Sequence, residues 1–185
     1  FAQSVAVMAV VGHALGLGDR HLDNILCDVA AGTIVHIDFN MAFGRGALLR
    51  VPEIVPFRMS PMFLAAMGYN VGLQGPFAAA AARTAAMLRS RTAATLVTRL
   101  IESLVLDAEW DAAGGAGGSV NDEDDHRRAA ALAILTTVRR KLAGAVAPDG
   151  SSEVLSVEDQ IQRLIDMATD ETRAASMYEG WTPWI

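Results

Sequence analysis

Six polar residues near the start of the 185-residue chain have the side-chain types that proton transfer and metal binding require: Asp19, Arg20, His21, Asp23, Asn24 and Asp38. A carboxylate can accept a proton from a hydroxyl group in a suitable geometry. Carboxylate and amide oxygens are also the ligands that a hard cation such as Mg2+ prefers, with phosphate oxygens and waters completing its shell. The set therefore indicates a site that combines a proton acceptor with a cation.

The segments between Asn24 and Asp38 predict how these two residues are positioned. Residues 25–29 and 33–37 are rich in β-branched and aliphatic side chains, and an Ala-Ala-Gly sequence separates them. This is the pattern of a β-hairpin. Because a hairpin returns the chain to the edge from which it started, we expect Asn24 and Asp38 to lie side by side and to act as oxygen ligands.

The spacing of the polar residues gives a second indication. Asp19 and Asn24 form a D-x-x-x-x-N pattern, the separation between the proton acceptor and the metal-binding Asn in protein-kinase catalytic loops. Asp38-Phe39-Asn40 stands where Asp-Phe-Gly follows in those kinases, and the loop reads Asp-Arg-His, the reverse of the usual His-Arg-Asp. Any one of these residues could be a turn or cap residue, but the combination in this order favours phosphoryl transfer.

Three motifs together resemble those of the phosphatidylinositol 3-kinase-related protein kinases: GLGDRHLDNIL at 16–26, HIDFN at 36–40 and VPEIVPFRM at 51–59. Leu22-Asp23 and Asn40 are most similar to the branch of the family that acts in nonsense-mediated mRNA decay, since most relatives have Pro-Ser and Gly at those places. The resemblance implies an α+β, mostly α fold. It would consist of the C-lobe of a PI3/PI4-kinase-type catalytic domain, with a small β-hairpin at its active site, and a helical C-terminal FATC segment.

The resemblance also implies an activity with its cofactors and partners. We expect a serine/threonine protein kinase that uses ATP with Mg2+ or Mn2+ and prefers a Ser or Thr followed by Gln. The expected partners are protein substrates, among them the RNA helicase of nonsense-mediated decay, and regulatory subunits of a large kinase complex.

Roles are carried over where the motifs match. Asp19 would orient the substrate hydroxyl and accept its proton, and His21 would contact the transferred phosphoryl group. Arg20 is grouped with these catalytic residues as a side chain that fixes the geometry of neighbouring carboxylates. Asn24 and Asp38 would hold Mg2+ on the ATP phosphates.

His36 is expected to steady the Asp38 segment, and the alternative for it is a half-buried histidine with its hydrogen bonds satisfied. From Phe39 to about Phe57, prolines and glycines argue against regular structure, and the resemblance makes this stretch the activation loop that receives the substrate. The residues assigned to that loop are Phe39, Asn40, Arg45, Arg50, Val51, Pro52, Glu53, Pro56 and Phe57.

Two alternative functions stay open. A phosphoinositide kinase shares the Asp-Arg-His loop, but its activation loop should carry a cluster of Lys and Arg for a phosphorylated head group. Here Arg45, Arg50 and Arg58 are scattered, which favours a protein substrate. A pseudokinase scaffold is the second alternative, and it should have lost one of the catalytic-loop carboxylates or metal ligands, all of which are present.

The chain divides into four parts by composition and resemblance. They are a catalytic C-lobe at 1–111, a Gly-rich and acidic linker at 112–128, an amphipathic helix at 129–147 and the FATC segment at 153–185. Ser156 and Asp159 predict a capping box at the start of a helix. The glycine-rich phosphate loop and the ATP-binding lysine belong to an N-lobe that would precede Phe1, so we expect this chain alone to be inactive.

Apolar residues in the second half of the C-lobe recur at helical spacing, and we expect them in the core: Leu96, Val97, Leu100, Ile101, Leu104 and Val105. Three aromatic residues near the end are expected to dock on the C-lobe, namely Tyr178, Trp181 and Trp184. An interfacial membrane anchor is the alternative for this tail, and the acidic residues Asp170 and Glu171 argue against it.

Charge and cysteine usage exclude further classes. The formal net charge of -6 and pI near 5.1 argue against direct nucleic-acid binding. The single cysteine, Cys27, excludes an internal disulfide framework, and we expect it to be packed in its strand. One unpaired cysteine suits a reducing compartment, so we expect a cytoplasmic or nuclear protein. No stretch has the length and apolar character of a transmembrane segment.

Overall fold

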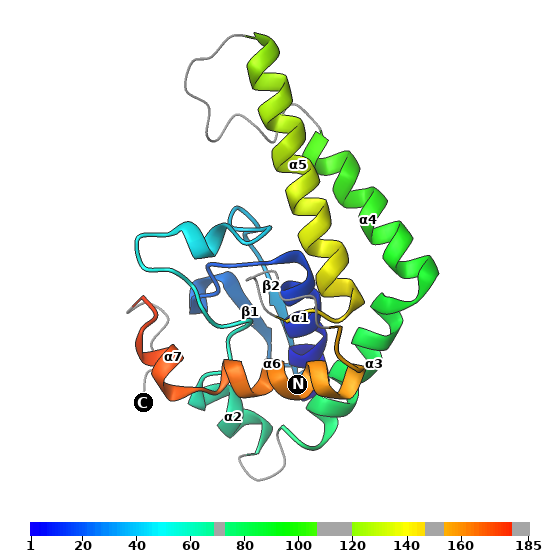
Figure 1. Cartoon of the computed structure of the whole chain (residues 1–185). Helices are drawn as coiled ribbons and strands as arrows, with labels where there is room; N and C mark the ends of the chain where they lie inside the picture. The colour runs from blue at the N-terminus through cyan, green and yellow to red at the C-terminus, as the bar shows by residue number, and fades with distance from the viewer. Residues whose placement is uncertain (69–72, 107–119, 147–153, 179–185) are drawn as a thin grey trace.

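The computed structural model describes residues 1–68, 73–106, 120–146 and 154–178. Helices form most of it, and a small antiparallel sheet lies beside the first helix (Figure 1). The helices are α1 (Ala2–Leu15), α2 (Pro61–Met67), α3 (Pro76–Arg89), α4 (Arg91–Leu106), α5 (Val120–Ala143), α6 (Val157–Ala168) and α7 (Glu171–Ala175). The strands β1 (Ile25–Asp28) and β2 (Thr33–His36) and the short 3-10 helices η1 (Leu22–Asn24) and η2 (Arg45–Leu48) complete the described elements. The expected mostly helical α+β fold with one hairpin is confirmed.

Helix α1 delivers the chain to the polar segment. Its residues Val5, Ala6, Ala9 and Val10 are buried, since α3, α5 and β2 all contact this helix. A helix that is apolar on nearly all sides is stable only when it is enclosed in this way. The catalytic loop, which follows α1, therefore begins in the interior of the helical part of the protein.

The C-terminus of α1 is closed by a hydrogen-bond pattern that depends on Gly16. This residue has a left-handed φ of 62°, its N–H donates to the His13 carbonyl oxygen at 3.0 Å, and the Leu17 N–H donates to that of Gly12 at 2.8 Å. The pattern is a Schellman motif, in which a glycine is favoured because the left-handed conformation penalises a Cβ. It turns the chain sharply out of the helix and into the catalytic loop.

The hairpin forms as expected, one residue shorter in each strand. Ile25 pairs with His36 and Asp28 with Thr33. The Asp28 carboxylate accepts hydrogen bonds from the N–H groups of the first two residues of the Ala-Ala-Gly turn, at 2.9 and 3.0 Å. Cys27 is exposed, so the expectation of a packed cysteine is wrong. Helix α1 packs mainly on β2, where Ile34 is buried, and Cys27 lies opposite Ile34 in β1, beyond the part of this face that α1 covers.

Helices α3 and α6 join the catalytic part of the chain to the C-terminal segment. Small residues of α3, Ala80, Ala81 and Ala85, are buried among its neighbours α1 and α6. Ser156 caps the start of α6: its Oγ accepts a hydrogen bond from the Asp159 N–H at 3.0 Å, and it donates to Asp159 Oδ2 at 2.7 Å. The first half of the predicted capping box is therefore confirmed, and the Asp159 carboxylate bonds to the hydroxyl in place of the Ser156 N–H.

The same junction contains a buried polar network. Arg89 donates to Gln160 Oε1 at 2.8 Å, and Gln160 Nε2 donates to the Lys141 carbonyl oxygen at 3.1 Å. Lys141 Nζ donates to the carbonyl oxygen of His13 at 3.0 Å, at the C-terminal end of α1. Because buried polar groups are costly unless paired, this network fixes α6 against α1, α3 and α5 in one arrangement.

Helices α4 and α5 lie side by side and extend away from the helical body (Figure 1). Of the six residues expected in the core of α4, Ile101 and Val105 are buried, whereas Leu96, Leu100 and Leu104 are 49–71% exposed. The expectation is wrong for these three leucines. They recur every four residues on the face of α4 that no described element covers, because α5 packs along one side of the helix only.

Helix α5 also corrects the division of the chain. It begins at Val120 and ends at Ala143, so the linker expected at 112–128 is wrong for its second half, and the helix expected at 129–147 begins earlier and ends earlier than predicted. Residues 112–119 lie outside the described part. Acidic residues fill positions 122–125, and acidic side chains are favourable in the first turns of a helix because of its macrodipole.

Helix α7, together with Met177 just after it, contacts the activation loop through the backbone of Ile54. The Ile54 N–H donates to Met177 Sδ at 3.4 Å, and Arg173 Nη1 donates to the Ile54 carbonyl oxygen at 3.2 Å. Tyr178 is 62% exposed, which contradicts its expected role as a buried anchor, and Trp181 and Trp184 lie outside the described residues.

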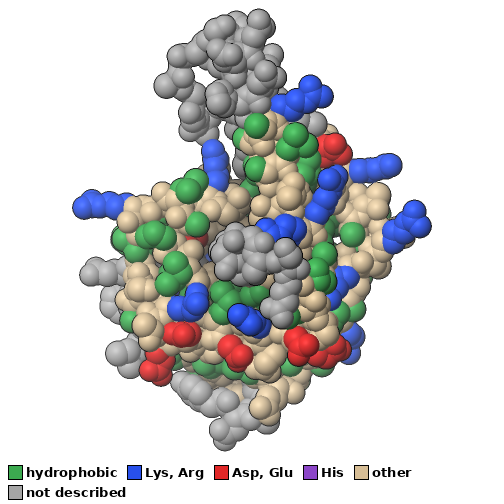
Figure 2. Space-filling view, in the orientation of Figure 1, with side chains coloured by type: hydrophobic (Ala, Val, Ile, Leu, Met, Phe, Trp, Pro, Cys, Tyr) green, Lys and Arg blue, Asp and Glu red, His purple; other side chains and the backbone are tan. Residues whose placement is uncertain are grey.

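A row of acidic side chains runs over α6 and α7 on the face seen in Figure 2. Such a row does not suit an anionic membrane surface. Within the described ranges, no helix combines the length and the apolar character needed to cross a bilayer.

Candidate active site

The catalytic loop is held by backbone hydrogen bonds to the start of the activation loop. The Gly18 N–H donates to the Met41 carbonyl oxygen at 2.6 Å, and the Gly44 N–H donates to that of Gly16 at 2.9 Å. The resulting contact is so close that a Cβ on Gly16 would lie 2.6 Å from the Gly44 nitrogen. The two loops therefore form one unit rather than two independent segments.

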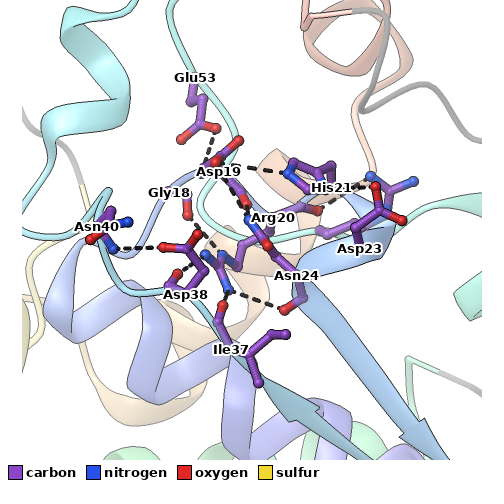
Figure 3. Close-up of polar contacts among 11 residues, drawn as sticks. Gly18, Asp19, Arg20, His21, Asp23, Asn24, Ile37, Asp38, Asn40 and Glu53 are labelled. Atoms are coloured by element: carbon purple, nitrogen blue, oxygen red, sulfur yellow. Dashed lines mark hydrogen bonds and ion pairs between the residues drawn. The ribbon is translucent and has the colours of Figure 1, made fainter.

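The guanidinium of Arg20 is the centre of the site. Its side chain is almost fully buried, at 2% exposure. It donates to the carbonyl oxygens of Gly18 at 2.7 Å, Asn24 at 3.2 Å and Ile37 at 2.6 Å, and to that of Asp38 (Figure 3). Sequence reasoning expected Arg20 to fix carboxylates, but each of these bonds goes to a backbone oxygen. A planar fork with several donors can bridge converging carbonyls in this way, and a lysine cannot.

Electrostatics around Arg20 follow from its burial. Burial lowers the pKa of Arg20, and the neighbouring Asp19, Asp38 and Glu53 act in the opposite direction. Because an arginine has so high an intrinsic pKa, the side chain keeps its charge. That positive charge interacts with three carboxylates: Asp19 of the catalytic loop, Asp38 at the end of the hairpin and Glu53 of the activation loop.

Asn24 and Asp38 are brought to the same edge of the hairpin, as expected. The Ile37 N–H donates to the Asn24 carbonyl oxygen at 3.0 Å, which continues the strand pairing by one residue. Asn24 is buried, and its Nδ2 donates to the Asp19 carbonyl oxygen at 2.8 Å, which leaves Oδ1 as its acceptor atom. Asp38 is exposed, and its Oδ1 accepts a hydrogen bond from the Asn40 N–H at 3.1 Å.

This donor set fits a hard divalent cation. One carboxylate and one amide oxygen are ligands of the type that Mg2+ uses, and Mg2+ normally keeps several waters and completes its shell with substrate phosphates. Among the described residues, no group of three or more His, Cys, Asp or Glu could hold a metal by itself. Asn24 and Asp38 would therefore hold the ion together with phosphate oxygens of a bound nucleotide.

Asp19 and His21 lie beside this edge. Asp19 has a left-handed φ of 57°, a conformation that is uncommon for a residue with a side chain and that concentrates at functional sites. His21 Nε2 lies 3.9 Å from Asp19 Oδ2, and its Nδ1 lies 3.8 Å from Asp23 Oδ2. The Asp23 side chain is 96% exposed, so it is solvated, and Asp19 is the carboxylate that belongs to the site.

His36 stands behind the metal edge in β2. Burial, together with the positive charge of Arg20, lowers the pKa of His36 to about 4, so the imidazole is neutral near pH 7. Its Nδ1 is buried and has no hydrogen-bond partner among the described residues. This contradicts the alternative of a fully satisfied histidine, and the supporting role stays a prediction.

The activation-loop residues do not all approach the site. Phe57 is buried and packs against Phe77 with ring centroids 6.3 Å apart, so it anchors the end of the loop. Phe39, Asn40, Arg50, Val51 and Pro52 are exposed, and Arg45 and Pro56 are partly buried. The loop also contains the 3-10 helix η2, which the expectation of no regular structure missed.

Two contacts of this loop were not foreseen from the sequence. Arg58 is 6% exposed and donates to the Arg20 carbonyl oxygen at 3.4 Å. Glu53 accepts a hydrogen bond from the Asp19 N–H at 2.6 Å. The only sequence signal for either contact was the presence of charged residues in a loop otherwise rich in Pro and aliphatic side chains.

Comparison with known proteins places these residues in a family context. The profile of the family described as phosphatidylinositol 3- and 4-kinase matches residues 1–111, and that of the FATC domain matches 154–185. The first match includes the catalytic loop, the hairpin and the activation loop. The second begins just before the capping box of α6.

Curated relatives and a solved structure are similar over different lengths. The serine/threonine-protein kinase MEC1 of Eremothecium gossypii is 36% identical over 184 residues, which is 100% of this chain and 7% of the relative. SMG1 of Danio rerio is 46% identical over 116 residues, 62% of this chain and 3% of the relative. The FAT and kinase domain of CtTel1 superposes with a TM-score of 0.74 at 31% identity, covering 97% of this chain and 12% of that one. The chain thus spans less than a tenth of the length of these curated relatives.

Proposed function

Because the chain belongs to the phosphatidylinositol 3- and 4-kinase family, and within it to the phosphatidylinositol 3-kinase-related kinases with a FATC domain, we propose that the protein is an ATP-dependent serine/threonine protein kinase. The observation that carries the proposal is the convergence of Asp19, Asn24 and Asp38 on one edge of the hairpin. A proton acceptor and two oxygen ligands are thereby fixed together around the buried guanidinium of Arg20.

The residues of the site have separate tasks in this proposal. Asp19 orients the hydroxyl of the substrate Ser or Thr and accepts its proton during transfer. Asn24 and Asp38 supply the oxygen atoms that hold Mg2+. When bound, Mg2+ neutralises negative charge on the ATP phosphates and orients them. His21 lies close enough to Asp19 to contact the transferred phosphoryl group. Arg20 holds the backbone of the catalytic loop against the end of the hairpin.

The hairpin offers an apolar surface beside this edge. Leu26, Val35 and Ile37 are 36–52% exposed on it. An exposed apolar surface next to oxygen ligands suits a nucleotide, because the flat base needs apolar contacts and the phosphates need the cation. This arrangement supports nucleotide binding with its phosphates directed toward Asp38.

A protein substrate is supported over a lipid head group. Of the three arginines in or next to the activation loop, Arg58 is buried and donates to the catalytic-loop backbone, so it does not contribute to a basic surface. Arg45 and Arg50 alone do not form the cluster that a phosphorylated inositol requires. The presence of Asp19, Asn24 and Asp38 in connected positions supports an enzyme over a scaffold.

A narrower assignment is part of the proposal. Leu22-Asp23 and Asn40 support the nonsense-mediated mRNA decay branch, with the RNA helicase of that pathway as substrate. The test is phosphorylation of the helicase by the full-length kinase, compared with a helicase in which every Ser or Thr before Gln is changed to Ala. Equal phosphorylation of both helicases would contradict the proposed specificity.

The activity itself is tested with the full-length polypeptide that contains this chain. Phosphate transfer from ATP to a Ser-Gln peptide should depend on Mg2+, and Asp19→Ala and Asp38→Ala should each lower kcat by roughly a hundredfold or more, because positioning and charge stabilisation are each worth several kcal/mol in such sites. Glu102→Ala, which removes an exposed carboxylate on α4, is the matched control and should leave kcat unchanged. Near-normal turnover by either folded Asp variant, or transfer to phosphatidylinositol vesicles in place of the peptide, would contradict the proposal.

A further inference from the structure

The carboxylate of Glu53 reaches from the activation loop back to the catalytic loop. Its Oε1 accepts a hydrogen bond from the backbone N–H of Asp19 at 2.6 Å, across 34 positions of sequence. The Glu53 N–H in turn donates to the Gly46 carbonyl oxygen at 3.0 Å. Figure 3 shows the Glu53 side chain directed at the Asp19 backbone, on the side of Asp19 away from Ile37. The contact therefore links three segments: the catalytic loop, η2 and the residues that follow η2.

Two glycines make room for this carboxylate. A Cβ on Gly46 would lie 2.8 Å from Glu53 Cδ, and one on Gly18 would lie 3.2 Å from the same atom, with Oε2 closer still in both cases. Neither glycine has a left-handed φ, so their backbone conformations do not call for glycine. The close approach of the Glu53 carboxylate does, because real Cβ atoms do not tolerate contacts below about 3 Å.

Asp19 needs such a partner because of its backbone conformation. A left-handed φ on a residue with a side chain is strained and persists only when neighbouring contacts hold it. A hydrogen bond from an N–H group to a charged carboxylate is stronger than one between neutral groups. Glu53 can therefore offset the strain at Asp19 and hold its side chain in one direction.

The segment that presents Glu53 is itself fixed from outside. Both backbone groups of the next residue, Ile54, are bonded to the α7 segment, the N–H to Met177 Sδ and the carbonyl oxygen to Arg173. With Ile54 held on both sides, the Glu53 backbone has little freedom to move away from Asp19. The FATC part of the chain thus contributes to the placement of Glu53 without touching the catalytic carboxylate.

We propose that Glu53 is a positioning residue that holds the backbone of the proton acceptor Asp19 in its left-handed conformation, through a hydrogen bond that Gly18 and Gly46 leave room for. The role of Asp19 as proton acceptor rests on the proposed function. The placement of its backbone by Glu53 does not, and the two can be tested separately.

The first test compares three substitutions in the full-length kinase acting on a Ser-Gln peptide. Glu53→Ala removes the acceptor and should lower kcat about tenfold to a hundredfold, since a small displacement of a reacting group has effects of that size, while KM for ATP stays within about twofold. Glu53→Gln keeps an oxygen of the same reach and should retain most of kcat. Glu102→Ala is the matched control. A kcat for Glu53→Ala within about twofold of the unmodified enzyme, or equal losses for Ala and Gln, would overturn the proposal.

A second pair of variants tests the contact itself. Gly46→Ala should lower kcat while Glu53 is present, because the new methyl group displaces the carboxylate. In the Glu53→Ala background the same change should add less than about a twofold loss, since the atoms that crowd Gly46 most closely are then gone. A purely structural effect of each substitution would instead multiply in the double variant, and that result would refute a shared mechanism.

Hydrogen exchange supplies a readout that does not depend on activity. Exchange of the peptide spanning 17–24 should be faster in Glu53→Ala than in the unmodified protein, and the increase should be much smaller in Glu53→Gln, which keeps an acceptor oxygen but not its charge. Unchanged exchange in Glu53→Ala overturns the positioning role even if the protein proves to have no kinase activity. If exchange is faster in Glu53→Ala but the Asp19→Ala variant has normal turnover, the positioning role of Glu53 stands and the proposed function is wrong.

Discussion

Arg20→Lys is the substitution whose outcome follows most directly from the structure. The guanidinium serves four backbone carbonyl oxygens from two sides of the hairpin edge. Asn24 O has a second donor in the Ile37 N–H, so the other three depend on Arg20 most. A lysine carries its donors on a single nitrogen and can reach one or two of these oxygens.

The expected magnitude comes from the acceptors that are left without a donor. With one or two buried or partly buried carbonyls unsatisfied at about 1–3 kcal/mol each, the edge should lose roughly 2–4 kcal/mol of local stability. Local opening governs amide exchange, so this loss corresponds to about thirtyfold faster exchange or more. Because Asp38 and Asn24 are displaced together, kcat should fall at least about tenfold in the same variant.

The assay is hydrogen exchange by mass spectrometry on the full-length protein, read from peptides that span 16–24 and 34–42, with kcat measured in parallel. Arg99→Lys on the exposed surface of α4 is the control for the chemical change itself and should alter neither quantity. If Arg20→Lys leaves exchange of both peptides and kcat within about twofold of the unmodified protein, then the four hydrogen bonds of Arg20 do not hold the edge.

Two further predictions concern the helices that carry the site. Burial and the neighbouring Lys141 lower the pKa of His13 from 6.5 to about 3. Between these two pH values the unfolded chain therefore binds a proton at His13 that the folded chain does not bind. The stability should fall as the pH falls below about 6.5, by about 2 kcal/mol at pH 5. His13→Leu should reduce the drop in Tm between pH 7 and pH 5, and an identical drop in both proteins would contradict the assignment. Ser156→Ala removes the cap of α6 and should cost about 1 kcal/mol, seen as about fivefold faster exchange of the peptide 156–163. Ser103→Ala on α4 should have no such effect, and equal exchange in the Ser156 and Ser103 variants would show that the capping box does not hold the helix end.

The hairpin and its two oxygen ligands could be predicted because their signals are local. Alternating β-branched segments around a Gly-containing turn determine both the strands and the edge at which Asn24 and Asp38 meet. The capping box at Ser156 is local in the same sense, since its two partners are three residues apart. Signals of this kind need no knowledge of the surrounding fold.

The contacts of Arg20 and Glu53 could not be predicted because their partners lie far apart in sequence. Arg20 bonds to carbonyl oxygens up to 18 residues away, and any residue type can supply a carbonyl. Glu53 bonds to a backbone N–H 34 residues away. Sequence patterns identify side chains, and here the missing half of each contact is backbone.

The helices show a related limit. Periodicity correctly placed a helix over the six apolar residues of α4, but it could not say that Leu96, Leu100 and Leu104 face away from α5. A helix with apolar residues on two faces has two possible partners, and the described chain supplies one. For α5, acidic residues that suggested a solvated linker instead occupy the first turns of a helix, where the macrodipole favours them.

The two aspartates proposed for proton transfer and metal binding share a left-handed backbone conformation. Asp19 and Asp38 have φ values of 57° and 56°, and each is held by a charged side chain that contacts backbone: Glu53 at the Asp19 N–H, and Arg20 at the Asp38 carbonyl oxygen. Because these charges act on the backbone, neither of the two bonds uses the carboxylate of Asp19 or Asp38. Replacing either charged side chain should therefore disturb catalysis by misplacing a carboxylate that is itself still present, which distinguishes such variants from those in which the carboxylate is removed.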